Sequence, residues 1–241
     1  MKIALLGYGK MGKTIERIAV SRGHKIVLRK DADRTFEGLQ NADVAIDFSL
    51  PEVAVCNISE CLNTNIPIVC GTTGWLENYQ EMVDLCKEKN GSFIYASNFS
   101  LGVNIFFELN NYLSKIMSKF NDYKVSIVEI HHTEKLDAPS GTAISLANEI
   151  IENSDLTNWT LENPKENELK INAIREENVP GTHSVFYHSE VDFLEIKHEA
   201  KSREGFALGA IIAAEFIHNK KGVFTMKEVL QLQGQFQLQY Q

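Results

Sequence analysis

The densest group of reactive side chains lies in the segment Glu129–Thr142, which contains two adjacent histidines and a lysine. An imidazole can donate a proton near neutral pH, as the reduction of an imine or activated alkene requires. Lys135 supplies a compact positive charge, and Ser140-Gly141-Thr142 supplies hydroxyls and the free amides of a helix start, which together suit a small dicarboxylate. The alternative is two surface histidines and a loop lysine before an ordinary capped helix. A zinc site is disfavoured, because His131 and His132 would point to opposite sides of a strand end.

A second motif, Gly7-Tyr8-Gly9-Lys10-Met11-Gly12, has the G-x-G-x-x-G spacing of a dinucleotide-binding turn. It follows an apolar run directly and opens a helical stretch. Gly7 permits the tight turn, Gly9 lets the backbone approach a pyrophosphate, and Gly12 lets the helix pack closely on the strand. The pyrophosphate would meet free N–H groups at the positive end of the helix. The pattern therefore favours dinucleotide binding over a merely structural glycine turn.

An acidic residue that binds the adenosine ribose is expected about 20 residues further on. Asp31 is the best candidate, and Asp33 is the next. Arg29, Lys30 and Arg34 crowd the same place and could accept a 2′-phosphate. The sequence therefore leaves NADH and NADPH both open, and without a cofactor the cluster would simply be solvated surface.

The segment Gly71-Thr72-Thr73-Gly74 follows another strand-like run. Sites in parallel sheets form beyond the carboxyl ends of the strands, so these small hydroxyl residues could contact the nicotinamide ribose. A helix N-cap formed by Thr73 is the alternative.

The first hundred residues alternate apolar strands with helices, which predicts a parallel sheet covered on both faces. Strands are expected at Lys2–Leu6, His24–Leu28, Ala42–Phe48, Ile66–Cys70 and Phe93–Ala96, and helices from the glycine turn to Arg22, from Pro51 onward, and over Trp75–Lys89.

After about Gly102 the pattern changes to one of consecutive strands, which predicts a mixed or antiparallel sheet with one covered face. The expected elements are helices at Asn104–Lys119, Thr142–Asn153 and Gly205–His218, strands at Lys124–His131, Lys170–Arg175, His183–Tyr187 and Asp192–His198, and a surface connection over 154–168. The glutamine-rich end, 231–241, could be a strand or a frayed tail. The fold class is therefore α/β, with a Rossmann-like parallel-sheet domain and an α+β domain that contains a mixed sheet.

The composition is that of an ordinary folded protein, with 44% hydrophobic and 23% charged residues among 241 and a formal net charge of -8. It contains no basic tract for nucleic acid, no apolar run near the ~20 residues of a membrane span, and no signal-peptide pattern. The cysteines, Cys56, Cys61, Cys70 and Cys86, have no metal-ligand spacing and read as reduced thiols. We therefore expect a cytoplasmic protein without nucleic-acid or membrane partners.

Together these segments resemble the 4-hydroxy-tetrahydrodipicolinate reductase (dihydrodipicolinate reductase) family of the diaminopimelate route to lysine. The resemblance rests on Gly7–Gly12, Gly71–Gly74, Ser97–Asn104 and above all Glu129–Thr142, with later echoes at Gly181–His183, Glu195–His198 and Arg203–Ala210. The order and spacing of these motifs cover nearly the whole chain.

The resemblance implies that NADH or NADPH reduces a cyclic dicarboxylate to tetrahydrodipicolinate. His131 and Lys135 would be the candidate proton donors, and His132 would bind substrate. Gly141 and Thr142 would hold a carboxylate, with Ser140 capping the helix nearby. The nicotinamide side of the cleft would be lined by Thr72, Thr73, Ala96, Ser97, Asn98 and Phe99, and no metal is expected.

The resemblance also implies two domains and a homotetramer. Residues 1–102 and 211–241 would form the dinucleotide-binding domain, and residues 103–210 would form the substrate-binding and oligomerisation domain. Glu134 and the run Arg175-Glu176-Glu177 depart from the family pattern, and Glu134 is expected to face solvent. The alternatives are another amino-acid-pathway dehydrogenase, which would lack the segment from His131 to Thr142, and a non-catalytic dinucleotide sensor.

Overall fold

The computed structural model of the chain describes residues 1–31 and 35–232. Asp33, Arg34 and the residues from 233 onward, on which some expectations fall, lie outside this part. The chain divides into two compact units, which are described separately. Unit 1 comprises Met1–Leu101 and Arg203–Gln241, and unit 2 comprises Gly102–Ser202.

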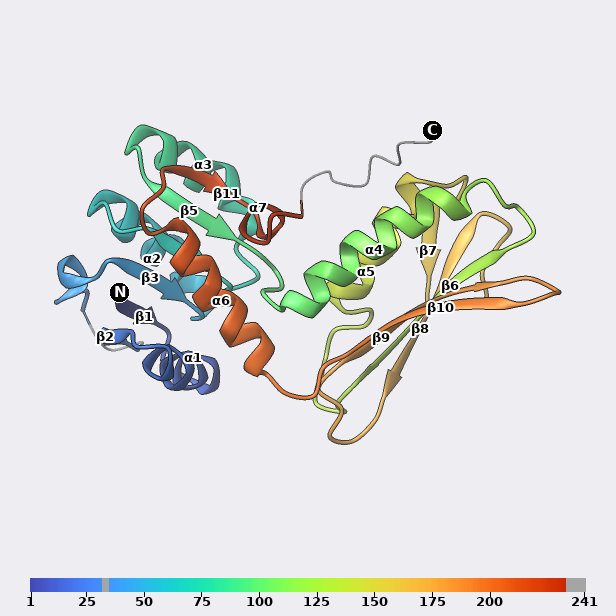
Figure 1. Cartoon of the computed structure of the whole chain (residues 1–241), viewed down its shortest axis with the longest axis horizontal. Helices are drawn as coiled ribbons and strands as arrows, with labels where there is room; N and C mark the ends of the chain where they lie inside the picture. The colour runs from blue at the N-terminus through green and yellow to red at the C-terminus, as the bar shows by residue number, and fades with distance from the viewer. Residues whose placement is uncertain (32–34, 233–241) are drawn as a thin grey trace. The chain divides into compact units, whose positions relative to one another are not determined.

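In the described part of unit 1, six parallel strands form a sheet with the order β11-β5-β4-β3-β1-β2 (Figure 1). The strands are β1 (Lys2–Leu6), β2 (Lys25–Lys30), β3 (Val44–Asp47), β4 (Ile68–Cys70), β5 (Ser92–Tyr95) and β11 (Gly222–Phe224). The helices are α1 (Lys10–Ser21), α2 (Pro51–Asn63), α3 (Tyr79–Glu88), α6 (Glu204–Ile217) and α7 (Met226–Val229), with 3-10 turns η1 (Leu39–Asn41) and η2 (Leu76–Asn78).

Both faces of this sheet are covered, as the continuous apolar strands predict. In β1, Ile3 and Leu5 pack with α1 and α6, while Ala4 and Leu6 pack with α2 and α3. All four side chains are fully buried. Burial on two faces explains why the strands read as unbroken apolar runs rather than as an alternation.

The strands expected in unit 1 are confirmed to within two residues at each end. The helix expected over Trp75–Lys89 is in part wrong, because the segment begins with the 3-10 turn η2 and becomes α-helical only at Tyr79. Trp75 is instead a buried core residue whose indole N–H donates to the Thr72 carbonyl at 2.7 Å.

The chain returns to unit 1 at Arg203 and not at Ile211, because α6 already joins the core of this unit at Ala207 and Ala210. Gly209 makes the contact possible, since a Cβ there would lie 1.7 Å from the Phe99 carbonyl oxygen. A Cβ on Gly205 would lie 3.6 Å from the Ser100 hydroxyl. The segment that leaves unit 1 and the helix that re-enters it therefore touch.

In unit 2, the described strands form a mixed sheet with the order β10-β9-β6-β8-β7, in which β6 runs parallel to β8 and antiparallel to β9. The elements are α4 (Leu101–Met117), β6 (Lys124–His131), α5 (Gly141–Glu152), β7 (Asn158–Thr160), β8 (Glu168–Arg175), β9 (Thr182–His188) and β10 (Phe193–Glu199). The mixed sheet is confirmed. The connection expected over 154–168 contains one short strand, β7. A strand of three residues is too short to show a hydrophobic pattern in the sequence.

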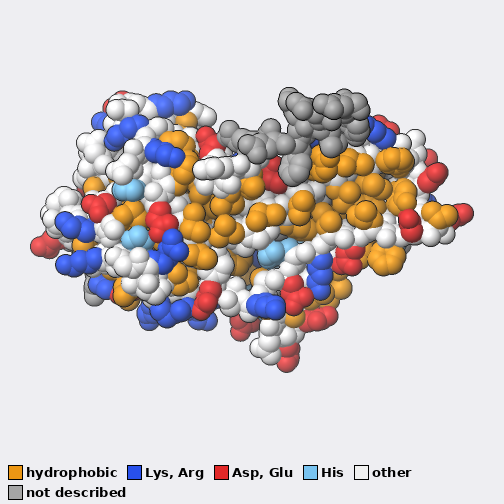
Figure 2. Space-filling view, in the orientation of Figure 1, with side chains coloured by type: hydrophobic (Ala, Val, Ile, Leu, Met, Phe, Trp, Pro, Cys, Tyr) orange, Lys and Arg blue, Asp and Glu red, His pale blue; other side chains and the backbone are white. Residues whose placement is uncertain are grey.

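One face of the unit 2 sheet packs on α4 and α5, through a core that includes Phe106, Ile127 and Leu146 (Figure 1). The other face carries half-buried and exposed apolar side chains, among them Ile174 and Phe193. Hydrophobic side chains also gather over the outer side of α4 (Figure 2), where Ile105, Leu109 and Ile116 are exposed. No described helix is long and apolar enough to cross a membrane.

Candidate active site

The glycine turn of unit 1 joins β1 to α1, and two of its glycines are required by packing. Gly7 has a φ of +91°, and a Cβ there would lie 2.1 Å from the Phe48 carbonyl oxygen at the end of the neighbouring β3. A Cβ on Gly12 would lie 2.3 Å from the Gly7 carbonyl oxygen. Gly9 is different, because a Cβ there would meet no described atom within 4 Å. The space above Gly9 is open, as the close approach of a pyrophosphate requires.

The start of α1 can receive an anion. No side chain caps it, and its first turn contains no acidic residue. Lys10 is exposed and Met11 half-buried at this end of the helix. The Tyr8 hydroxyl donates a hydrogen bond to Glu16. The turn therefore fits the pyrophosphate of a dinucleotide, with the first amides of α1 as donors.

Asp31 follows β2 directly and is exposed, at the strand end where a ribose-binding carboxylate is expected. The neighbouring Arg29 donates two hydrogen bonds to Glu16, which lower the pKa of Glu16 to about 2. Lys30 is buried, with its ammonium 4.8 Å from the centre of the Phe36 ring. Two of the three basic residues expected near a 2′-phosphate are thus engaged within unit 1.

The loop Gly71-Thr72-Thr73-Gly74 is fixed by a buried carboxylate at the end of β3. The Thr72 hydroxyl donates to Asp47 at 2.8 Å and accepts from the backbone N–H of Ser49, also at 2.8 Å. Burial raises the pKa of Asp47, whose other oxygen accepts from Asn57. Thr73 is exposed, and the described helices that follow are not capped by it. Thr72 therefore shapes the loop, and Thr73 presents its side chain outward.

The segment Ala96-Ser97-Asn98-Phe99 leaves the carboxyl end of β5, on the same sheet edge as the glycine turn. Ala96 and Asn98 are half-buried, and Ser97 is exposed. The Phe99 side chain is 1% exposed and packs edge-on against Phe48. Phe99 could therefore reach a coenzyme only through its backbone.

In unit 2, Ser140 caps α5 as expected, because its hydroxyl accepts from the Ala143 N–H at 3.2 Å. Gly141 is exposed, and a Cβ there would meet no described atom within 4 Å. Thr142 is half-buried in the same turn. The start of α5 is thus open to a carboxylate in the way that Gly9 is open to a phosphate.

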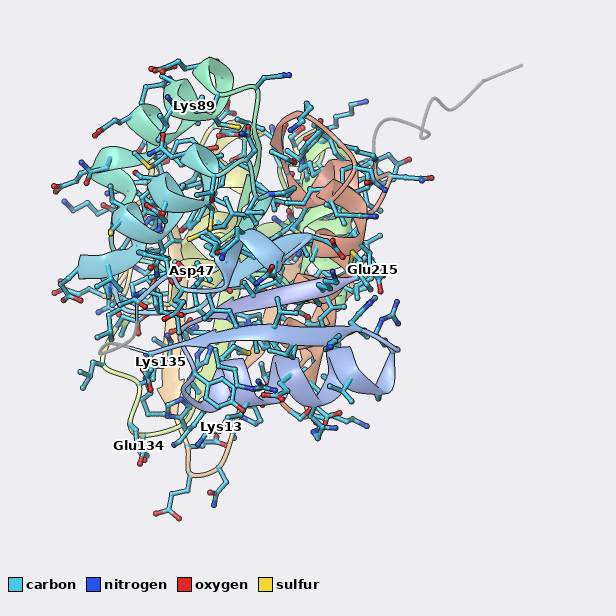
Figure 3. The ribbon with its side chains drawn as sticks, turned by 90° about the vertical axis from the view of Figure 1, so that its left-hand side faces the viewer. Lys13, Asp47, Lys89, Glu134, Lys135 and Glu215 are labelled. Carbon is cyan, nitrogen blue, oxygen red and sulfur yellow. The ribbon has the colours of Figure 1, made fainter. Side chains whose placement is uncertain are left out.

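The loop between β6 and α5 carries Lys135, whose ammonium is held by Asp137 at 2.7 and 2.8 Å. Burial works against the shift, but the hydrogen bonds from Lys135 lower the pKa of Asp137. Figure 3 shows Glu134 at the outer end of this loop, where it is exposed as expected. His132 is half-buried, and its Nδ1 has no partner among the described residues.

His131 lies in a cluster that the sequence did not predict. Its Nδ1 is 3.7 Å from the carboxylate of Glu129, and His183 Nε2 lies 3.7 Å from the same oxygen. His183 Nε2 is also 3.0 Å from the Ser140 hydroxyl. Arg175 reaches this carboxylate from β8 at 3.3 Å. The cluster is buried, and Glu129 is 0% exposed.

Burial favours the neutral form of both imidazoles of the cluster. Burial lowers the pKa of His131, opposed by the charge of Glu129 and assisted by Lys135 and Arg175. Burial also lowers the pKa of His183 to about 3. Burial therefore disfavours the imidazolium form of both rings.

Glu129, His131 and His183 each offer a ligand atom, and these atoms lie within 4.8 Å of one another. The carboxylate is already engaged by the Ser140 N–H and by a guanidinium, and Lys135 adds a second positive charge nearby. A dication would be the third cation in one buried place. We therefore describe the three residues as a buried polar cluster.

Glu129, Arg175 and His183 were not among the site residues predicted from the sequence. A signal existed in β6, where Glu129 and His131 are two residues apart and so face the same side. The remaining partners depend on strand pairing, because Glu129 lies opposite His183 and His131 opposite Arg175. No local pattern fixes that register.

Known proteins resemble this chain over nearly its whole length. Family profiles described as "Dihydrodipicolinate reductase, N-terminus" and "Dihydrodipicolinate reductase, C-terminus" match residues 1–99 and 102–230. A 4-hydroxy-tetrahydrodipicolinate reductase of Christiangramia forsetii is 57% identical over 233 residues, covering 95% of this chain and 98% of the relative. One from Thermosipho africanus is 37% identical over 232 residues, with the same coverage. A solved structure, a dipicolinate-bound dihydrodipicolinate reductase from Paenisporosarcina sp. TG-14, has the same fold, with a TM-score of 0.73 at 22% identity over 95% of this chain and 98% of that one.

Proposed function

The chain belongs to the dihydrodipicolinate reductase family, and we propose that it reduces 4-hydroxy-tetrahydrodipicolinate to tetrahydrodipicolinate in the diaminopimelate route to lysine. It is an oxidoreductase whose coenzyme is NADH or NADPH. One observation carries the proposal furthest. A single loop of unit 2 brings together the Lys135 ammonium, the buried imidazole of His131 and the open start of α5. A sensor that only bound a dinucleotide would have no use for these groups.

The coenzyme is held by the carboxyl edge of the unit 1 sheet. The first amides of α1 and the open space at Gly9 receive the pyrophosphate, and Asp31 lies where the ribose is expected. Thr73 and the segment Ala96–Phe99 lie at the same edge and would contact the nicotinamide half. When bound, the reduced nicotinamide supplies a hydride to the substrate ring.

The two carboxylates of the substrate require separate partners in unit 2. The amides of Gly141 and Thr142 at the start of α5 hold one of them, because an uncompensated helix N-terminus favours an anion. Lys135 and His132 bind the second carboxylate of the ring. Each of these groups lies on the loop between β6 and α5 or on the first turn of α5.

Reduction adds a hydride and a proton, and the 4-hydroxyl group leaves as water. Lys135 is the favoured proton donor, since its ammonium is only partly buried and is held in place by Asp137. Burial lowers the pKa of His131, which favours the neutral form of its ring. Its ring therefore orients the substrate by hydrogen bonding, while the mobile proton comes from Lys135.

The test is an absorbance assay in which the purified protein is mixed with the cyclic substrate and either NADH or NADPH. Consumption of the reduced coenzyme that depends on the substrate is the expected result. Binding of dipicolinate, a planar analogue, should be measured by calorimetry in the presence of coenzyme. Coenzyme binding without turnover would instead favour the sensor.

We further propose that the protein acts in the cytoplasm as a homotetramer. The support for assembly is the uncovered face of the unit 2 sheet, where Ile174 and Phe193 are 39% and 64% exposed. Exposed apolar patches of this kind mark protein–protein contacts. Light scattering on the purified protein should give four chains per particle, and Ile174→Glu should reduce that number. A monomer at assay concentrations would refute the assembly.

A further inference from the structure

Glu129 is a buried carboxylate that fold stability alone does not explain. It is 0% exposed, and a buried ion is costly unless it is paired. The Ser140 N–H donates to its Oε2 at 3.0 Å, and Arg175 Nη1 lies 3.3 Å from its Oε1. Replacing buried ion pairs by apolar residues often leaves stability unchanged or improved. The buried charge of Glu129 therefore points to a role in positioning its neighbours.

The carboxylate reaches three parts of the substrate loop. His131, at the start of the loop, follows Glu129 by two residues on the same face of β6. Ser140, at the end of the loop, donates its backbone N–H. Arg175 connects the carboxylate to the middle of the loop, since it donates to the carbonyls of Lys135 at 3.4 Å and Asp137 at 2.6 Å.

Resting on the proposed function, we propose that Glu129 is the positioning residue of the substrate site. It fixes the loop that carries the proton donor and orients the imidazole of His131. His183 completes the arrangement, because its Nε2 lies 3.0 Å from the Ser140 hydroxyl and 3.7 Å from the Glu129 carboxylate.

The geometry assigns a tautomer to His131. Its Nδ1 is buried, has no partner in the described structure and faces the carboxylate at 3.7 Å. A proton on Nδ1 would be directed at Glu129, and a small movement on substrate binding would close the hydrogen bond. The other charged groups that act on this ring are Lys135, Arg175 and Asp137, and the His183 ring lies 4.9 Å away, centre to centre.

The test compares Glu129→Gln with Glu149→Gln, since Glu149 is another hydrogen-bonded glutamate of unit 2 and accepts from Asn110. Turnover by the wild-type protein comes first, because its absence would refute the proposed function and not this inference. In Glu129→Gln we expect kcat to fall roughly 10²-fold and dipicolinate to bind more weakly. The KM for NADH should stay unchanged, and Glu149→Gln should behave as wild type.

Two readouts separate positioning from a general structural role. Ring nitrogen NMR of histidine-labelled protein, assigned with His131→Gln, should show the Nδ1–H tautomer of His131 in the wild type and its loss in Glu129→Gln. The pH profile of kcat should change shape in Glu129→Gln, whereas simple loss of folded protein would scale it uniformly. Wild-type kcat with an unchanged His131 tautomer would overturn the proposal, as would an equal loss of NADH binding.

Should Glu129→Gln fail to fold, Arg175→Gln tests the same link from the partner side. The expected result is again a fall in kcat and in dipicolinate affinity at constant KM for NADH. If Arg175→Gln folds and retains wild-type values for both, the carboxylate does not position the loop.

Discussion

Each unit buries one carboxylate near the carboxyl end of an inner strand, but the two carboxylates have different neighbours. Asp47, at the end of β3, is surrounded by the neutral donors of Asn57, Thr72 and Cys70, and burial raises its pKa. Glu129, in β6, faces a guanidinium and two imidazoles.

The difference matches the work assigned to each unit. A loop that only has to hold a coenzyme needs a fixed shape, and neutral hydrogen bonds provide it without moving protons. A loop that has to orient a charged substrate and deliver a proton needs cations and imidazoles within reach. In both units a buried carboxylate near a strand end accepts hydrogen bonds from a nearby loop, which is the loop after β4 in unit 1 and the loop after β6 in unit 2.

The largest effect is expected at Lys135, because proton transfer is proposed for unit 2 alone. Lys135→Ala should lower kcat by about 10²–10⁴-fold, because general acid catalysis contributes that much. Steady-state kinetics should show an unchanged KM for NADH. Lys165→Ala, which removes an exposed lysine of the same unit, is the control. Full turnover by Lys135→Ala would return the role to His131.

The complementary change in unit 1 is Asp47→Asn, which keeps the shape but turns one acceptor into a donor facing the Thr72 hydroxyl and the Cys70 thiol. A mispaired buried group costs about 1–2 kcal/mol, so NADH affinity should fall roughly tenfold. Fluorescence titration with NADH measures this, and kcat at saturating coenzyme should not change. Asp84→Asn, on the surface of α3, is the control. A loss of kcat without a loss of NADH affinity would contradict the coenzyme-binding role of the loop that Asp47 holds.

The charged cluster of unit 2 should also appear in the pH dependence of stability. His183 has a pKa lowered to about 3 when folded, against 6.5 for the free side chain. Its contribution is therefore complete above pH 6.5 and is lost as the pH falls toward 3, by up to about 1.4 kcal/mol per pH unit. Urea denaturation across this range should show a shallower decline for His183→Gln than for the wild type. His188→Gln, on the exposed end of the same strand, should retain the wild-type slope.

The smallest effect concerns the choice of coenzyme in unit 1. Glu16 binds Arg29 next to the strand end that should meet the adenosine ribose. Glu16→Gln removes the balancing charge, and the ratio of kcat/KM for NADPH to that for NADH should rise about threefold, or roughly 0.6 kcal/mol. Glu204→Gln, which removes the exposed pair with Arg17, should leave the ratio unchanged. A ratio that did not move would show that Arg29 has no part in the selection.

Local pattern was sufficient for most of unit 1. Apolar runs located β1 to β5 but not the three-residue strand β11, and the glycine spacing located a turn whose contacts at Gly7 and Gly12 are those expected. It failed where a tertiary contact decides the structure. Nothing in the sequence near Ile211 shows that α6 already docks at Ala207, because the docking depends on Gly209 meeting Phe99.

The site of unit 2 divides in the same way. The loop, the helix cap at Ser140 and the exposure of Glu134 follow from local sequence. The partners of His131 do not, since Arg175 and His183 come from strands paired with β6 on either side. Their register results from the packing of the whole sheet, and only the structure reveals it.

The contact between Gly209 and Phe99, with Gly205 beside Ser100, means that the chain departs from unit 1 and rejoins it at one spot. The intervening hundred or so residues are therefore an insertion with adjoining ends, of the kind that proteins tolerate readily. A gene encoding this coenzyme half could exchange its inserted half for another without disturbing the sheet that binds the dinucleotide. The same dinucleotide-binding domain could in this way be combined with inserted domains that support different reactions.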